Sequence, residues 1–484
     1  MGRTTERDSR NQGQDGRRSK NTDKYNKETR NSNRDNRSEE EIRPTVEGRK
    51  RGATRASMSK KERRALKQQK LRELPFGEVV EDLKPTWVKV MESKTPKEER
   101  SELVGQLSSG LTGLWEEIIV RQVPMRMACA VVKYGSREQI QALHKELKGK
   151  YVPIIKDQNS YRIAIYFLRF RKENGCDDIA QEIIDEIVRN DHLPQVALHQ
   201  KGSDVLNEIY IKMTSIERDA LFIACQSKVV RRLMRFHNVK SIRDVYEKME
   251  NHNALNDTLA RFVRKSAEHG FMYLPFYQFC ARRIVDIFAA FSMQHCKESL
   301  VHMNPHILQF CLSNDGSRLG CASAYYLSAQ GRRQMLRFMN NTDETGGVYP
   351  VELMIASEHG WKILAVLSLW IDDVTRLKDR VFTRFATDEI WDSEYLKRFL
   401  AVVLSDRPIN YLTKKIRTYA AQPETSKKEP ERRRRQIFEA LMKLHPTRME
   451  KIREEELFDL KDILAPHFES FVPEVDSDVD SDDE

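Results

Sequence analysis

The chain has 484 residues, of which 39% are hydrophobic and 32% are charged, with a formal net charge of +10. The hydrophobic share is low for one compact globule and suits a helical solenoid with polar ends. The excess of Lys and Arg favours a polyanionic partner, because each cation placed on a phosphate releases condensed counterions. The longest apolar stretches, such as residues 363–371, are too short to cross a bilayer, so we expect no membrane partner.

The beginning of the sequence and its cysteines indicate a compartment. MGRTTERDSRNQ contains no apolar run, so a secretory signal is not expected. The seven cysteines are scattered without a CxxC pair, which favours neither a zinc site nor a disulfide framework. They indicate reduced, buried thiols of a cytosolic or nuclear protein.

Taken in order, the chain begins with residues 1–56, a polar and basic segment with almost no large apolar side chains, for which disorder is predicted. Residues 57–74 contain SKKERRALKQQKLREL, which predicts a basic helical segment with Ser59 as its N-cap. Residues 75–421 show dense helical spacing, as in Leu103, Leu107 and Leu111, without the alternation of strands. An all-α fold is therefore expected.

Three segments complete the chain. Residues 422–435, QPETSKKEPERRRR, predict a basic linker, and residues 436–472 a last helical segment that forms a partial repeat. Residues 473–484 form an acidic tail that contains serine, for which disorder is predicted. Two readings of this tail stay open, a solubilising tail or a phosphorylatable segment that contacts basic partners.

Internal similarity predicts the architecture. PMRMACAVVKYG (124–135) resembles SYRIAIYFLRFR (160–171), and Arg126 aligns with Arg162 at an offset of 36 (162 − 126). HGWKILAVLSLW (359–370) and YLKRFLAVVLSD (395–406) repeat that offset (395 − 359), and DGSRLGCASAYYL (315–327) begins in the same way. A helical unit of this length cannot bury its apolar face alone, so neighbouring units must stack into a superhelical solenoid.

No catalytic or metal motif is present. GxxxxGK[ST], GxGxxG, HExxH and GxSxG are all missing from the sequence. His302 and His306 are four residues apart, but Pro305 between them breaks a helix and no third ligand follows, so they read as ordinary histidines. Asp372 and Asp373 read as a solvated or packing pair at a helix end. We expect a protein that is not an enzyme and has no cofactor.

Several segments, in the same order, resemble one known family. They are SKKERRALKQQK, WVKVMESKTPKEERSELVGQL (87–107), VVKYGSREQIQALHKELKG (131–149), YRIAIYFLRF, NDGSRLGCASAYYL, LSLWIDD and SKKEPERRRRQIFEAL. Together with the repeat length, they resemble Pumilio-homology (PUF) repeat proteins of the nucleolar Puf-A type, over about residues 59–445. The resemblance implies armadillo-like helical repeats. Members of this type are usually longer and form a bent, L-shaped superhelix, and we expect this chain to lack their final repeats.

The resemblance also implies how such repeats contact RNA. One helix per repeat lines the inner face, with a stacking residue between two residues that contact a base edge. We place the stacking positions at Arg126, Tyr161, Arg318, Trp361 and Lys397. The edge pairs would be Met125 with Cys129, Ser160 with Ala164, Ser317 with Cys321, Gly360 with Leu364, and Leu396 with Leu400.

Almost none of these edge pairs has two polar members, and apolar side chains cannot make the paired hydrogen bonds that distinguish bases. Stacking and charge would remain, and both tolerate any sequence. The candidate RNA-binding residues are Arg126, Ser160, Tyr161, Arg162, Ser317, Arg318, Trp361, Lys362, Lys397 and Arg398. The alternative reading of the aromatic and arginine side chains is packing between helices.

Three basic clusters suit either a nuclear import signal or phosphate contacts. They comprise Arg49, Lys50 and Arg51; Lys60, Lys61, Arg63 and Arg64; and Arg432, Arg433, Arg434 and Arg435.

The function expected from these observations is RNA binding with low sequence specificity, without catalysis. The resemblance implies a monomer in the nucleus and nucleolus that acts on precursor ribosomal RNA, with pre-ribosomal proteins, in large-subunit ribosome biogenesis. One alternative is a repressor of translation that binds messenger RNA. Another is a helical scaffold that binds proteins and touches no RNA.

Overall fold

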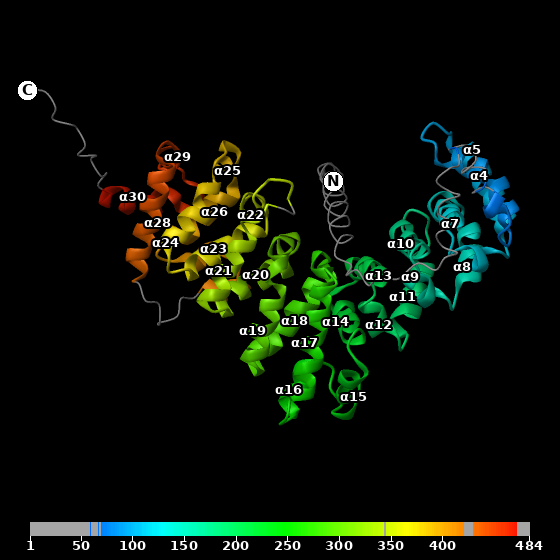
Figure 1. Cartoon of the computed structure of the whole chain (residues 1–484), viewed down its shortest axis with the longest axis horizontal. Helices are drawn as coiled ribbons and strands as arrows, with labels where there is room; N and C mark the ends of the chain where they lie inside the picture. The colour runs from blue at the N-terminus through cyan, green and yellow to red at the C-terminus, as the bar shows by residue number, and fades with distance from the viewer. Residues whose placement is uncertain (1–58, 60–65, 67–68, 343–344, 421–428, 472–484) are drawn as a thin grey trace, which may run out of the picture.

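The computed structural model describes residues 59, 66, 69–342, 345–420 and 429–471. All regular elements in these segments are helices, and they form the open crescent of Figure 1. This confirms the predicted all-α solenoid. The predicted tails 1–56 and 473–484 lie outside the described residues, as does most of the predicted helix over 57–74.

One series of helices runs through the crescent, each packed against the next, and we call them the inner helices. They are α7 (Gln122–Tyr134), α10 (Tyr161–Phe170), α13 (Gln200–Lys212), α18 (Pro275–Phe291), α20 (Asn314–Tyr326), α23 (Gly360–Trp370) and α26 (Glu394–Leu404). Upstream of α7 lie α4 (Gly77–Met91), α5 (Lys97–Leu111) and α6 (Trp115–Ile118).

The inner helices alternate with helices that cover them. In the first half these are α8 (Arg137–Leu147), α9 (Tyr151–Lys156), α11 (Asp177–Arg189) and α12 (Leu193–Ala197). In the second half they are α19 (Met293–Met303), η2 (Asn304–Leu312), α21 (Ala329–Phe338), α22 (Pro350–Ile355), α24 (Val374–Arg380), η3 (Phe382–Arg384) and α25 (Asp388–Asp392). Polar caps define several starts: Ser136 and Gln139 form a reciprocal capping box at α8, which satisfies backbone N–H groups that the helix leaves free.

A recurrent turn precedes four of the inner helices. In it, a small residue lies against the carbonyl oxygen of the residue six positions earlier, where a Cβ atom on a glycine would approach to 2.5 Å. The pairs are Gly202 with Val196, Gly316 with Phe310 and Gly360 with Met354, while at α10 the Ser160 hydroxyl donates to the Ile154 carbonyl at 3.0 Å. Because the turn has the same geometry each time, it sets the register of the repeats.

We expect Gly316→Ala to lower the free energy of unfolding by about 1–3 kcal/mol, because the added methyl group would overlap the Phe310 carbonyl and the Gln278 side chain. Urea unfolding would measure the change. Gly105→Ala is the control, because its Cβ would meet only the Gln139 side chain at 3.5 Å inside α5. That variant should be neutral or stabilised by up to about 1 kcal/mol. Equal loss in both variants would show that the close turn is not what matters.

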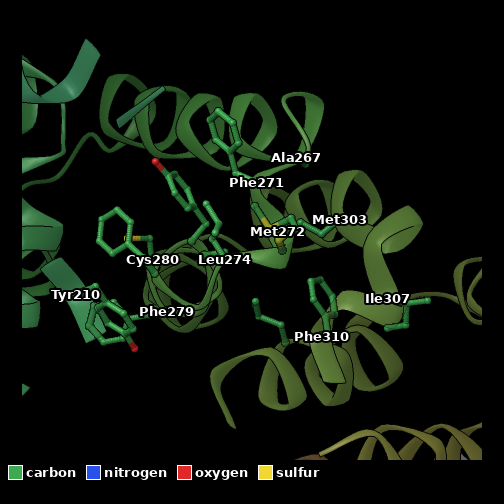
Figure 2. Packing of buried hydrophobic residues seen from close by; sticks show 14 of the residues in the cluster. Tyr210, Ala267, Phe271, Met272, Leu274, Phe279, Cys280, Met303, Ile307 and Phe310 are labelled. Atoms are coloured by element: carbon green, nitrogen blue, oxygen red, sulfur yellow. The ribbon is translucent and has the colours of Figure 1, made fainter. Parts of the chain in front are cut away.

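The middle of the chain interrupts the sequence repeat but not the packing. Between α13 and α18 lie α14 (Ser215–Ala224), α15 (Lys228–Phe236), α16 (Ile242–Lys248), α17 (Asn253–Glu268) and η1 (Phe271–Tyr273), yet α18 packs directly on α13. Figure 2 shows this junction, where the rings of Phe279 and Tyr210 lie 5.4 Å apart. These extra helices explain why the sequence between residues 190 and 300 gives no clear repeat register.

The C-terminal part corrects the predicted linker over 422–435. Residues 430–435 belong to α28 (Pro430–Leu444), because Pro430 suits the first turn of a helix, and residues 421–428 lie outside the described residues. The predicted last helical segment is present as α28, α29 (Pro446–Ile452), η5 (Leu457–Asp459) and α30 (Leu460–Ser470). The short elements η4 (Pro408–Tyr411) and α27 (Arg417–Ala420) connect α26 to it.

The interior is one continuous hydrophobic cluster that extends from Val80 to Leu464. All seven cysteines are free thiols, six of them buried and Cys311 partly buried. Burial raises the pKa of the Cys129 thiol to about 12, which makes this thiol unreactive. No described helix has the length and apolar character that a bilayer crossing requires.

Candidate nucleic-acid interface

The recurrent turn identifies equivalent positions on the inner helices. We call the small residue of this turn the close-contact position. The next residue is buried, and the residue after that lies on the accessible side of the helix at Arg162, Asp204 and Arg318. The equivalent residue on α23 is Lys362, which is buried. Two further members follow from the 36-residue offset, Arg126 from Arg162 (162 − 126) and Arg398 from Lys362 (398 − 362). We call this set the inner row: Arg126, Arg162, Asp204, Arg318, Lys362 and Arg398.

The N-terminal part of the inner row carries available positive charge. Arg126 on α7 and Arg162 on α10 are exposed, and neither belongs to an ion pair of the described residues. A hydrogen bond with the Tyr161 hydroxyl is the largest cause that raises the pKa of Arg162, so its guanidinium stays charged. Two turns after Arg126, Lys133 lies 4.7 Å from the centre of the Tyr134 ring. The surface of α7 and α10 thus offers cations beside aromatic rings.

An acidic residue interrupts the row on α13. Asp204 accepts a hydrogen bond from the Tyr273 hydroxyl at 3.1 Å, which ties α13 to η1. Farther along the same helix, Glu208 forms an ion pair with Arg169 of α10. Positive potential from α7 and α10 therefore falls toward α13.

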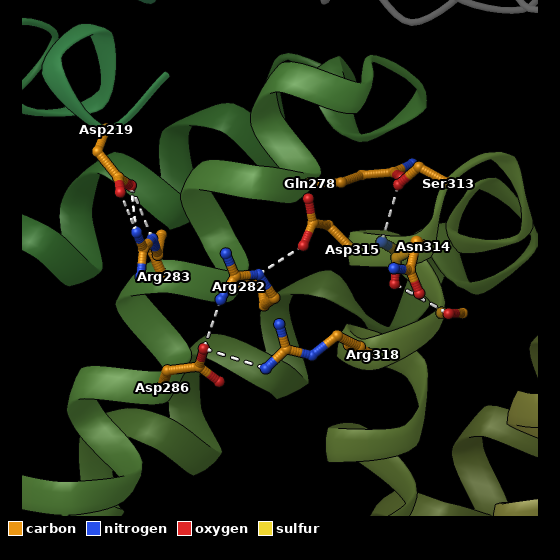
Figure 3. A network of polar contacts seen from close by, with 11 residues as sticks. Asp219, Gln278, Arg282, Arg283, Asp286, Ser313, Asn314, Asp315 and Arg318 are labelled. Atoms are coloured by element: carbon orange, nitrogen blue, oxygen red, sulfur yellow. Dashed lines mark hydrogen bonds and ion pairs between the residues drawn. The ribbon is translucent and has the colours of Figure 1, made fainter. Parts of the chain in front are cut away.

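On α18 and α20 the arginines are already paired. Figure 3 shows Arg282 of α18 between Asp286 and Asp315, each at 2.6 Å, while Arg318 of α20 lies 3.4 Å from Asp286. In the same view, Arg283 forms an ion pair with Asp219 of α14. These contacts join three helices and neutralise much of their positive charge. Arg318 is consequently a packing residue as well as a candidate contact.

Farther along, the cations are covered or paired. Lys362 is 7% exposed, and burial lowers the pKa of its ammonium group. Lys397 lies 2.5 Å from Glu455, and Arg398 forms an ion pair with Glu394 while it covers the Phe458 ring at 4.8 Å. This end of the inner row therefore offers less free charge than α7 and α10.

The structure corrects the predicted stacking positions at Tyr161 and Trp361. These rings are 4% and 1% exposed and lie between neighbouring helices. They stand one residue after the close-contact position, whereas Arg126 and Arg318 stand two residues after it, so the prediction mixed two registers. Ser160 and Ser317 are also fully buried, and their hydroxyls donate to backbone carbonyls of Ile154 and Asn314. The packing reading holds for Tyr161 and Trp361, and the two serines also belong to the buried wall.

The predicted edge pairs do not form a contact surface either. Their members are buried inside the wall of the solenoid, so they present no polar edge to a ligand: Met125, Cys129, Ser160, Ala164, Ser317, Cys321, Gly360, Leu364, Leu396 and Leu400. The sequence could not show this, because a repeat offset aligns residues without indicating which of them faces solvent.

The basic clusters have different outcomes. Those around Arg49, Lys50 and Arg51 and around Lys60, Lys61, Arg63 and Arg64 lie outside the described residues. The third forms the first turns of α28, where Arg432 and Arg435 are exposed and Arg434 is partly exposed. Arg433 is buried, donates to the carbonyls of Ser368 and Ile371, and lies 3.5 Å from Asp372. Arg433 therefore serves packing rather than an exposed basic run.

The other residues singled out from the sequence have local roles. Asp373 caps α24 by accepting a hydrogen bond from the Arg376 backbone N–H at 3.2 Å, as the packing reading predicts. Burial lowers the pKa of His306, which lies at a kink in η2. Among the described residues, no group of three or more His, Cys, Asp or Glu side chains is placed to hold a metal ion.

Two residues of this surface were missed from the sequence. Lys133 and Arg169 lie seven residues after Arg126 and Arg162 and therefore on the same face of α7 and α10. Their spacing was the available signal. The expected contact positions all lie in the first turns of the helices, whereas Lys133 and Arg169 lie two turns farther along.

Comparison with curated proteins finds two distant relatives, and no family model matches the chain. Pumilio homolog 24 of Arabidopsis thaliana is 21% identical over 337 residues, which are 68% of this chain and 50% of that protein. Pumilio domain-containing protein 12 of Caenorhabditis elegans is 21% identical over 359 residues, which are 74% of this chain and 44% of that protein. The chain thus spans about half the length of the curated relatives it matches.

Comparison with solved structures shows which known fold this chain shares. The structure of human Puf-A matches with a TM-score of 0.68 and 18% identity, over 82% of this chain and 76% of that chain. The structure of human Puf-A in complex with DNA matches with a TM-score of 0.65 and 18% identity, over 80% of this chain and 76% of that chain. The resemblance predicted from the sequence is confirmed.

Proposed function

This chain has the Pumilio-type helical solenoid of Puf-A, and from that premise we propose that it binds RNA through its inner helices. One observation carries the proposal: the inner row places the exposed side chains of Arg126 and Arg162 on adjacent helices without a carboxylate partner among the described ion pairs. Free guanidinium groups bind phosphate in a bidentate manner and stack on bases of any kind. The solved complex of human Puf-A with DNA supports a nucleic-acid ligand.

We propose further that the chain reads little sequence. In the register of the inner row, the residues beside each contact position are Met125 with Cys129, Tyr161 with Ile165, Ser317 with Cys321, Trp361 with Ala365, and Lys397 with Ala401. None of these pairs has two side chains able to make the hydrogen bonds that distinguish bases. The polar pair Ser203 and Asn207 on α13 is buried, and Asn207 already accepts from the Phe276 backbone N–H at 3.1 Å.

The cellular role is a proposal from the resemblance to the Puf-A type. We propose a monomeric, non-catalytic factor of the nucleus and nucleolus that holds precursor ribosomal RNA and pre-ribosomal proteins together during maturation of the large subunit. Crosslinking in cells would test this role. Crosslinks concentrated on large-subunit precursor RNA are the expected result. Crosslinks to messenger RNA would favour the repressor, and an absence of RNA crosslinks would favour the protein scaffold.

A competition assay tests the low specificity. RNA selected for tight binding from a random pool should displace a labelled RNA of mixed sequence only a few times better than the unselected pool does. Specific nucleic-acid recognition typically reaches preferences of about a thousandfold or more. A preference of that size would contradict this account and favour sequence-specific repression.

A further inference from the structure

Four arginines line one small groove between α21 and α24, the helices that follow inner helices α20 and α23. The groove has a volume of about 130 Å³ and is lined by Arg333, Leu336, Arg337, Arg376 and Arg380. The Asn340 side chain of the segment after α21 donates to the Arg380 carbonyl at 3.0 Å and holds the two walls together. This site lies one helix layer away from the inner row.

The charges in this groove are largely unbalanced. Each wall carries two exposed arginines four residues apart, Arg333 with Arg337 and Arg376 with Arg380, which places like charges on one helix face. Only Arg376 has a carboxylate partner among the described ion pairs, Asp373 at 2.7 Å. Burial raises the pKa of Asp373, but hydrogen bonds from Arg376 and the charges of Arg376 and Arg333 outweigh it and lower that pKa. Such a cluster of positive charges is suited to bind an anion.

The chemistry of the groove favours a phosphodiester backbone. Guanidinium groups one helical turn apart, at about 5–6 Å between Cβ atoms, can meet neighbouring phosphates of one strand. The groove is smaller than the roughly 300 Å³ of a small-molecule site. Its only apolar lining residue, Leu336, is buried, so no apolar anchor of the kind that dominates protein interfaces is offered.

We propose that this arginine groove is a second RNA-binding site, which takes the phosphates of a structured RNA segment that passes over the outside of the solenoid. The proposal rests on the RNA binding proposed above. It adds a site outside the inner row, so that a single RNA would be held both by α7 and α10 in the N-terminal half and by the groove between α21 and α24 in the C-terminal half.

The test uses the full-length chain and a labelled RNA hairpin with a single-stranded flank of mixed sequence, titrated at several salt concentrations. Arg333→Gln/Arg337→Gln removes one wall of charge and Arg376→Gln/Arg380→Gln the other. Arg261→Gln/Lys265→Gln removes the same charge from two exposed positions, also four residues apart, on α17. All the exchanged side chains are exposed, so thermal unfolding should not fall in any variant.

Each groove variant should weaken hairpin binding about tenfold at moderate salt and reduce the slope of log affinity against log salt by about 1–2. The α17 control should leave both quantities close to those of the unchanged chain. If the groove variants bind the hairpin as well as the control does, the proposal is overturned. That result is also expected if the groove binds an acidic protein instead of RNA. If Arg126→Gln/Arg162→Gln still weakened binding, the proposed function would stand, whereas no RNA binding by the unchanged chain would overturn both.

Discussion

Replacement of Arg433 by alanine is expected to lower the free energy of unfolding by about 2–4 kcal/mol. The guanidinium of Arg433 is buried and bonds to the Ser368 and Ile371 carbonyls at the end of α23, with Asp372 at 3.5 Å. Burial lowers the pKa of Arg433 to about 10, with Asp372 opposing that shift, so the group remains charged at neutral pH. Its loss would leave backbone carbonyls unsatisfied and detach α28 from the repeat array. Urea unfolding measures the change.

The control lies two residues away in the same run of arginines. Arg435 is exposed and forms an ion pair with Glu439 at 3.1 Å, one helical turn along α28. Arg435→Ala should change the free energy of unfolding by no more than about 0.5 kcal/mol. Similar losses for both variants would mean that the buried contacts of Arg433 do not hold α28 in place.

The second large effect concerns binding. Arg126→Gln/Arg162→Gln should weaken binding to a single-stranded RNA of mixed sequence by about 2 kcal/mol or more, roughly thirtyfold in Kd. Both side chains are exposed and outside the described ion pairs, so their removal takes away available charge and stacking surface without disturbing the core. Fluorescence anisotropy gives the Kd. Thermal unfolding should remain unchanged.

The same row supplies the comparison for this variant. Arg318→Gln/Arg398→Gln removes an equal charge, but these guanidinium groups are already paired with Asp286 and Glu394. We expect a smaller loss of affinity together with a measurable loss of stability, because Arg318 belongs to the network of Figure 3. Equal losses of affinity in the two double variants would contradict the distinction between free and paired arginines.

The sequence was sufficient for the fold because the apolar spacing and the 36-residue offset both survive in the structure. Arg126 and Arg162 do occupy equivalent places on α7 and α10. The offset failed between residues 190 and 300, where four α-helices, α14–α17, lie between two inner helices that nevertheless touch. A contact between residues far apart in the chain does not appear as a repeat offset in the sequence.

The candidate site was less predictable, since a shift of one residue moves a side chain about 100° around the helix axis, which can take it from the accessible to the buried side. Tyr161 and Trp361 have the residue types of a stacking platform but stand on the buried side. The register is set by Gly202, Gly316 and Gly360 against carbonyls six residues earlier, a geometry that appears only in three dimensions. Ion pairs between distant segments, such as Lys397 with Glu455, also could not be predicted from residue spacing.

The central claim is that free cations of the inner helices bind the phosphate backbone of RNA. The salt dependence of the RNA affinity of the unchanged chain tests this claim. With three or more phosphates contacted, log affinity should fall linearly with log salt at a slope of about −2 or steeper for single-stranded RNA. The slope should be the same for RNAs of unrelated sequence. An affinity that hardly changes between low and moderate salt would contradict the account.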